Sequence, residues 1–195
     1  MSFLNKVNIT IIISIVFLLS IPLKSFSQQF QLNNPSSDLK IYGTSSLHDW
    51  HEEVEEQKGS ISIDNSDNLT ISALKLEIMS ESLKSGKRGM DKNTYKALKT
   101  DTYKTITFQL NEVKSITKIS DQNYKVEVYG NLTITGVTKK IQLNFELSLS
   151  DKSIKLKGEK SFKMTDYNID PPTALLGTIT TGDEVTIKFN TVFNK

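Results

Sequence analysis

The sequence has no cysteine among its 195 residues. This absence excludes disulfide bonds, thiolate metal sites, cysteine nucleophiles and a lipid-modified N-terminal cysteine. Histidine is scarce as well, since His48 and His51 are the only two. The sequence also lacks a G-x-S-x-G segment and a glycine-rich phosphate-binding loop. Few routes to enzymatic chemistry therefore remain, and serine pairs such as Ser45-Ser46 are better explained as strand and turn residues.

Charge of one sign is also lacking. The chain has 24 lysines and arginines against 22 aspartates and glutamates, and residues 1–27 contain two of the basic residues and no acidic one. Without that segment 22 charges of each sign remain, and the lysines are scattered among the carboxylates. Binding to phosphate backbones needs a clustered basic surface. The composition therefore argues against nucleic acid as a partner.

Residues 1–27 are predicted to be a secretory signal peptide that is cleaved after Ser27. A basic start precedes an apolar run over residues 9–23, and small residues stand just before the cleavage point. Ser20 and Pro22 interrupt the run, whereas a spanning helix needs roughly 18 uninterrupted apolar residues. We expect a periplasmic or secreted protein with no membrane span after cleavage. The remaining 168 residues suit one domain.

Strand-like alternation of apolar and polar residues is what the chain has in abundance. The clearest case is Val126 to Leu149, where two alternating runs flank the polar connection 135–140. Gly136 in this connection can adopt a positive φ angle at little cost. The pattern predicts a β-hairpin with one apolar face and one wet face. A single hairpin is marginal in water, so its apolar face needs further strands.

Further alternating segments supply these strands, and two of them change parity, as β-bulges do. The predicted strands are residues 39–47, 60–63, 69–80, 105–113, 154–164 and 184–193, with parity changes within 69–80 and near Glu112. A helix capped by Asp91 is predicted over residues 91–100, and loops over 81–90 and 165–183. Residues 28–38 are interpreted as a polar lead-in to a domain over 39–195. About eight antiparallel strands and one short helix indicate an all-β sandwich or barrel.

One segment, residues 48–56, fits both a helix and a strand. Trp50 and Val54 have helical spacing, yet Trp50, Glu52 and Val54 also alternate as in a strand. A helix would let His48 and His51 share a metal ion, with Asp49, Glu52 or Glu53 as further ligands, whereas a strand would separate them. A two-histidine spacing without a third committed ligand is weak, so we favour surface or hydrogen-bonded histidines.

Several motifs, taken in order, resemble the YceI-like family of secreted bacterial proteins. They are Gly43-Thr44-Ser45-Ser46-Leu47-His48-Asp49-Trp50, Gly59 to Asp64, Met90 to Phe108, Tyr129 to Lys139 (similar to the family hairpin G-x-L-T-I-x-G-V-T-K) and Phe162 to Ile169. The resemblance covers essentially the whole chain after residue 27. It implies a periplasmic, lipocalin-like, eight-stranded antiparallel barrel, and it favours a strand for residues 48–56. Members of the family enclose a long isoprenoid or fatty amide in an apolar tunnel. The Leu47-to-Trp50 piece departs from the form typical of lipid carriers, which leaves the ligand open.

The leading hypothesis is a non-enzymatic protein that binds an isoprenoid or other long-chain lipid inside an apolar barrel. The predicted lining residues are Trp50, Ile78, Phe108, Leu132, Phe145, Phe162, Met164 and Phe189, and the predicted contacts to a polar headgroup are His48, Asp166 and Tyr167. No cofactor is expected, and a homodimer is left open. One alternative is a packed, ligand-free barrel acting as an envelope stress or interaction module. A less favoured alternative is a metal-dependent enzyme using His48 and His51.

Overall fold

The computed structural model describes residues 28–65 and 68–195, so the predicted signal peptide lies outside the described residues. The strands are β1 (Gln28–Leu32), β2 (Asp38–Ser45), β3 (Trp50–Val54), β4 (Gln57–Asp64), β5 (Thr70–Met79), β6 (Leu83–Lys84), β7 (Thr105–Ser120), β8 (Asn123–Ile134), β9 (Val137–Leu149), β10 (Ser153–Lys163), β11 (Thr173–Ala174) and β12 (Ile179–Asn194). The helix α2 (Arg88–Leu98) and the 3-10 turns η1 (Asn34–Ser36), η2 (Ser80–Ser82), η3 (Met164–Tyr167) and η4 (Leu175–Gly177) complete the described elements.

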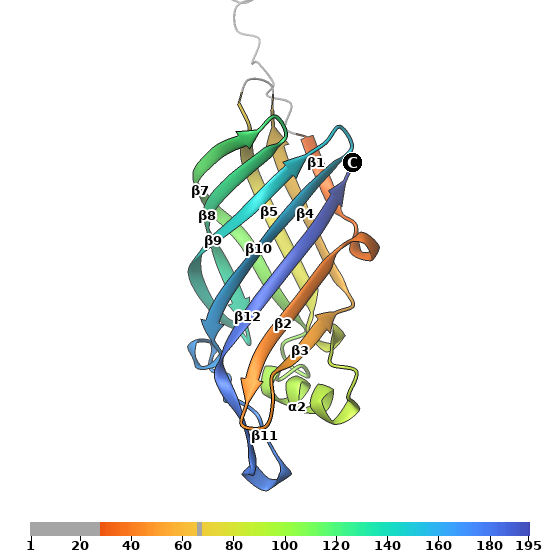
Figure 1. Cartoon of the computed structure of the whole chain (residues 1–195), viewed down its shortest axis with the longest axis vertical. Helices are drawn as coiled ribbons and strands as arrows, with labels where there is room; N and C mark the ends of the chain where they lie inside the picture. Colours follow the sequence, from red (N-terminus) through yellow and green to blue (C-terminus); the bar gives the residue numbers. More distant parts are fainter. Residues whose placement is uncertain (1–27, 66–67) are drawn as a thin grey trace, which may run out of the picture.

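Eight of the strands form a closed antiparallel ring. Their order is β1-β4-β5-β7-β8-β9-β10-β12, and β12 pairs back to β1 through Leu32 opposite Phe193. The end of β1 and the end of β12 therefore meet at the same end of the molecule (Figure 1). The predicted eight-stranded, lipocalin-like antiparallel barrel with a single short helix is confirmed.

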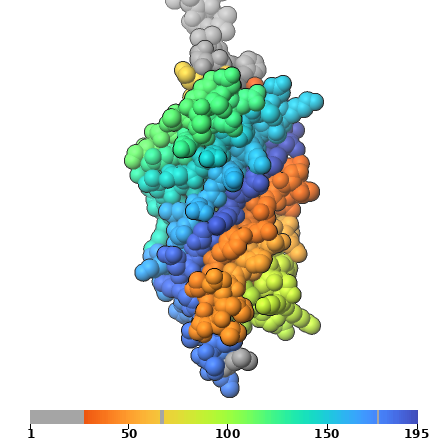
Figure 2. Space-filling model, in the orientation of Figure 1, coloured from red at the N-terminus to blue at the C-terminus, as the bar shows by residue number. Residues whose placement is uncertain are grey.

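The opposite end of the barrel has a different wall. Here β12 pairs with β2 instead of β1, and β2 pairs with β3, which in turn pairs with the short β6. The helix α2 follows β6 and lies against this end (Figures 1 and 2). Residues 48–56 thus contain a strand, β3, as the family resemblance implied. The strands β2, β3 and β6 therefore form the wall at this end, and α2 covers it.

The segment interpreted as a polar lead-in, residues 28–38, is part of the barrel. It contains β1, which pairs with β4 and β12, followed by the turn η1. The side chain of Phe30 is almost fully buried. The prediction missed β1 because the strand has only two large apolar residues, Phe30 and Leu32, between glutamines. The barrel therefore begins at Gln28 and not at residue 39.

The helix begins earlier than predicted. Arg88 is its first residue and Lys87 is its N-cap, so Asp91 does not cap it. The Asp91 carboxylate instead accepts hydrogen bonds from the backbone N–H and the hydroxyl of Ser85, at 2.9 and 2.6 Å. The sequence did not predict the first turn of the helix, because it contains Gly89 and glycine is an unfavourable helix residue. Asp91 thus fastens the helix to the segment that precedes it.

Parity changes in two strands are confirmed as bulges. In β5 the register with β4 shifts at Ser72, which lies between the paired residues Ile71 and Ala73. In β7 the register with β8 shifts between Leu110 and Glu112. Each extra residue returns the following apolar side chains to the interior and bends the strand, as a closed barrel requires.

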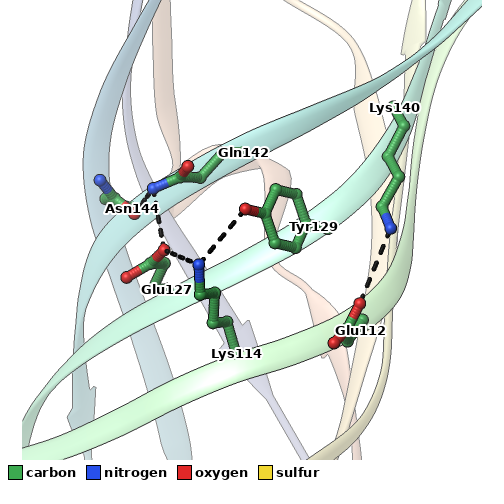
Figure 3. Close-up of polar contacts among 7 residues, drawn as sticks. All are labelled: Glu112, Lys114, Glu127, Tyr129, Lys140, Gln142 and Asn144. Atoms are coloured by element: carbon green, nitrogen blue, oxygen red, sulfur yellow. Dashed lines mark hydrogen bonds and ion pairs between the residues drawn. The ribbon is translucent and has the colours of Figure 1, made fainter.

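The hairpin of β8 and β9 has the predicted wet outer face (Figure 3). Glu127 accepts a hydrogen bond from Gln142 Nε2 at 2.9 Å and pairs with Lys114 of β7 at 3.6 Å. Lys140 pairs with Glu112 at 3.7 Å. These side chains project from three adjacent strands, and the apolar residues between them point inward. Such exposed pairs contribute little stability each, so burial on the inner face holds the hairpin.

The connection of this hairpin is tighter than predicted. β8 ends at Ile134 and β9 begins at Val137, so only Thr135 and Gly136 form the turn, with φ angles of +48° and +76°. Two consecutive positive φ angles are typical of the type I′ turns that match strand twist. Thr135 is an unusual residue for this conformation, and its hydroxyl donates to the carbonyl oxygen of Tyr167. The turn is therefore tied to η3.

Candidate functional site: the cavity beneath helix α2

A cavity of about 420 Å³ lies inside the barrel at the end covered by α2. This volume falls within the range of small-ligand sites. The walls come from β2, β3, β12, α2 and the loop after η3, and most of the contributing side chains are apolar. They include Leu39, Ile41, Val54, Leu83, Met90, Ala97, Ile106, Ile134, Ile169, Val185 and Ile187. The other half of the barrel is filled by buried side chains such as Phe30, Ile61, Val128, Leu147 and Phe193.

Trp50 forms part of the cavity wall and is held in a fixed place. It is paired across β2 and β3 with Gly43, and its indole ring covers this glycine so closely that a Cβ atom there would overlap the ring. The indole Nε1 donates a hydrogen bond to the carbonyl oxygen of Thr44 at 2.9 Å. Trp50 is also the only tryptophan in the chain. The tryptophan fluorescence of the protein therefore comes from a residue in the cavity wall.

Glu52 is a buried carboxyl group in the same wall. It lies two residues after Trp50 on β3, opposite Ile41, and its side chain is 2 % exposed. The Thr94 hydroxyl of α2 donates a hydrogen bond to Glu52 Oε1. Burial raises the pKa of this carboxyl from 4.5 to about 7 against the opposing effect of that hydrogen bond, and the nearby Asp91 charge raises it further. No other carboxyl among the described residues lines the cavity.

Half of the predicted lining residues line this cavity. Trp50, Ile78, Phe162 and Met164 contribute to its wall. Phe108, Leu132 and Phe145 are buried in the core and Phe189 packs against it, but none of these four contributes to the cavity wall. The barrel interior is thus divided into a filled part and a hollow part, and not open along its whole length.

The three predicted headgroup residues are not brought together. His48 lines the cavity from the bend between β2 and β3, and its Nδ1 lies 2.8 Å from the carbonyl oxygen of Asp49. Asp166 is exposed and pairs with Lys139 at 3.0 Å. Tyr167 is buried with its ring edge against Phe162, and burial, aided by the Asp166 charge, raises its pKa to about 12. Neither Asp166 nor Tyr167 contributes to the cavity wall.

The two histidines lie on different sides of the barrel wall. His51 is on the outer face of β3, where its ring stacks on Tyr42 with 5.8 Å between centroids, whereas His48 lines the cavity. Over residues 28–65 and 68–195, no group of three or more histidines and carboxylates is arranged to hold a metal ion. The two histidine side chains therefore do not face a common site.

Sequence reasoning considered Glu52 only as a candidate metal ligand beside the histidines and did not consider Thr94. Glu52 has the same parity as Trp50 and Val54, and both of these apolar neighbours face inward. That parity was the available signal, but it applied only once the segment was known to be a strand. Nothing in the local pattern indicated Thr94, because its place depends on how α2 lies over the barrel end.

The sequence matches the family model of the YceI-like domain over residues 30–193. The chain belongs to the YceI-like family. Solved structures with the same fold include Burkholderia cenocepacia BcnA, with a TM-score of 0.67, 17 % identity and coverage of 83 % of this chain and 98 % of that one. A polyisoprenoid-binding domain from Saccharophagus degradans, implicated in plant cell wall breakdown, also has a TM-score of 0.67 at 17 % identity, covering 85 % and 97 %.

The YceI protein of Campylobacter jejuni is similar as well, with a TM-score of 0.57, 20 % identity and coverage of 74 % and 84 %. At such identities the likeness to this YceI-like chain concerns the fold. A search of curated protein sequences gives no match. Within the described residues, no helix is long and apolar enough to cross a membrane.

Proposed function

We propose that this YceI-like protein is a non-catalytic carrier that holds an isoprenoid or other long-chain lipid in the cavity beneath α2. The observation that carries the proposal is the cavity itself, an apolar space of about 420 Å³ inside a barrel whose other half is packed. A domain of the same fold from S. degradans is described as polyisoprenoid-binding, which supports the assignment to a lipid. The separation of His48 from His51 supports binding in preference to metal-dependent catalysis.

Apolar burial is sufficient to hold such a ligand. Each buried methylene contributes roughly 0.8 kcal/mol, so ten of them would contribute about 8 kcal/mol before the costs of association. The long chain needs no charged contact along its length. A wall of aliphatic side chains with Trp50 and Phe162 is suited to this kind of binding.

The proposed setting is the periplasm or the extracellular space. It rests on the signal peptide predicted for residues 1–27, with cleavage after Ser27. In that setting, a long-chain lipid is an available and poorly soluble ligand that benefits from enclosure. The proposal includes no nucleic acid partner, and it applies equally to a single domain and to a homodimer.

Organic extraction of the protein, purified from its own envelope and analysed by mass spectrometry, tests the carrier function. We expect a long-chain lipid in stoichiometric amount. Uptake of polyprenyl alcohols in vitro, followed by the fluorescence of Trp50, provides the second measurement. Absence of lipid from the native protein together with absence of uptake would contradict the proposal.

A matched pair of variants shows whether the ligand occupies this cavity. Ala97 lines the cavity from α2, so Ala97→Phe places a ring in the ligand volume. Lys92 is an exposed residue of the same helix, and Lys92→Phe adds the same ring outside. We expect uptake to be lost in Ala97→Phe and kept in Lys92→Phe. Equal uptake by both variants would place the ligand elsewhere.

The packed half of the barrel favours a second candidate, a ligand-free envelope stress or interaction module. Phe108, Leu132 and Phe145 close the interior there. For this candidate, extraction would yield no lipid, and Ala97→Phe would leave the stress or interaction function unchanged.

A further inference from the structure

The burial of the Glu52 carboxyl costs free energy of folding. The carboxyl is almost fully buried in a wall of apolar side chains, and a buried carboxylate costs free energy unless it is paired and hydrogen-bonded. Only the Thr94 hydroxyl donates to it, and no ion pair reaches it within residues 28–65 and 68–195. An aliphatic residue would fill this position on β3 at lower cost. A function for the carboxyl in binding a ligand within this cavity accounts for its presence.

The chemistry around Glu52 restricts what the function can be. A carboxylate accepts hydrogen bonds and attracts positive charge, and in an apolar cavity both interactions are strong because water does not compete. A ligand end that is itself anionic would be repelled and would carry an unpaired charge into the cavity. Asn93 of α2 is a further polar side chain in the cavity wall, whereas the Thr94 hydroxyl is already bonded to Glu52. Lys87 and His48, the basic residues in the wall, are both exposed.

We propose that Glu52 is the polar anchor of the cavity and binds the hydrogen-bond-donating end, a hydroxyl or an amine, of a long-chain ligand. This inference rests on the proposed carrier function and specifies its ligand class. The apolar chain fills the space between Trp50, Ile106 and Ile187, and the donor of its polar end reaches the Glu52 carboxyl. Lipids with a carboxylate or phosphate end are disfavoured at this position.

Four probes with the same 16-carbon chain test the proposal. They are hexadecan-1-ol, hexadecylamine, hexadecanoate and the methyl ester of hexadecanoic acid, each titrated into the full folded protein at pH 8 while Trp50 fluorescence is recorded. We expect the alcohol and the amine to bind about tenfold or more tightly than hexadecanoate, because a hydrogen bond to a buried charged group is worth at least that factor. The ester, which has no donor and no charge, measures the contribution of the chain.

Two variants separate an anchor from a merely structural residue. Glu52→Gln removes the charge at nearly constant shape. We expect it to bring the alcohol to within about threefold of the ester, and the amine to within about threefold of hexadecanoate, because each pair then pays a similar desolvation cost. Thr94→Val removes the hydrogen bond that ties α2 to β3 but keeps the carboxyl, so the preference should persist. Glu53→Gln, on the outer face of the same strand, is the control and should behave like the parent.

A preference for donors that Glu52→Gln abolishes and Thr94→Val retains supports the anchor. Equal binding of all four probes by the parent, a preference that survives Glu52→Gln, or identical behaviour of the Glu52→Gln and Thr94→Val variants would overturn it while leaving the carrier function intact. Failure of all four probes to bind would also overturn the anchor, and the extraction and polyprenyl-uptake experiments would then decide the carrier function separately.

Discussion

At the scale of single residues, Glu52 combines a buried carboxyl with a pKa raised from 4.5 to about 7. The raised pKa means that the folded protein holds this proton more tightly than the unfolded chain does. Below pH 4.5 the carboxyl is protonated in both states, and it does not lower the free energy of unfolding. Between pH 4.5 and 7 the unfolded chain ionises first, so the free energy of unfolding falls as the pH rises. Above pH 7 both states are ionised and the loss stays constant.

We therefore predict that the free energy of unfolding of the ligand-free protein is lower at pH 8 than at pH 5, by up to about 3 kcal/mol from this group. Glu52→Gln cannot ionise, so the variant should lose this dependence. Denaturant titrations at pH 5, 6, 7 and 8 measure both proteins. The Asp91 carboxylate of α2, whose charge also acts on Glu52, has a lowered pKa and so titrates at lower pH, outside this window.

Glu53→Gln is the matched control for this prediction. Glu53 lies on the exposed outer face and pairs with Lys40 at 2.8 Å, which lowers the pKa of its carboxyl. A lowered pKa affects stability only below about pH 4.5, so this variant should keep the fall in stability between pH 5 and 8. A parallel pH dependence in the parent and in Glu52→Gln would show that Glu52 is not the group responsible.

At the scale of elements, alternation in the sequence predicts which face of β9 is buried. Phe145 is 4 % exposed, whereas its neighbour Asn144 projects to the outside. Phe145→Asp removes a large core side chain and buries a carboxylate, so we expect a loss of about 4 kcal/mol or more in the free energy of unfolding. Asn144→Asp should change it by less than about 0.5 kcal/mol. Thermal and denaturant unfolding measure both, and equal damage would contradict the observed orientation of β9.

The turn between β8 and β9 makes a second prediction at this scale. Gly136 has a φ angle of +76°, and a Cβ atom there would lie 2.7 Å from Cε1 of the Tyr103 ring. Gly136→Val is therefore strained twice, and we expect a cost of about 2 kcal/mol or more. Thr138→Val loses only an exposed hydrogen bond to Thr133, so its cost should stay below about 1 kcal/mol. Similar unfolding midpoints for the two variants would argue against this turn geometry.

The sequence predicts the β8–β9 hairpin and the bulges but not β1 or the start of α2, and each case has a physical reason. The hairpin of β8 and β9 and the bulges at Ser72 and Asn111 follow from alternation of apolar residues, because each strand buries one face. β1 was missed because Phe30 and Leu32 are too few to make a pattern. The start of α2 was missed because Gly89 opposes helix formation and packing against the barrel end overrides that preference.

At the scale of the whole molecule, the division of the barrel into a packed half and a hollow half was beyond sequence reasoning. Inward-facing residues such as Phe108, Leu132 and Phe145 have the same alternation as Phe162 and Met164, yet only the last two line the cavity. Which inward side chains meet and which leave space depends on strand tilt and on the position of α2. The depth at which Glu52 is buried is likewise a tertiary property.

The closure of the ring through β1 and β12 has a consequence for how the protein comes to fold. The pairs that complete the ring, Leu32 with Phe193 and Gln31 with Asn194, join residues about 160 positions apart, and β12 also supplies the partner for β2 and β10. A chain that emerges from its N-terminus during synthesis or export must therefore hold β1, β2 and β10 with open edges until residues 179–194 arrive. Open edges invite pairing with other chains. The last strand thus ends the period in which this protein is prone to aggregate, and a chaperone that shields nascent edges would act before β12 appears.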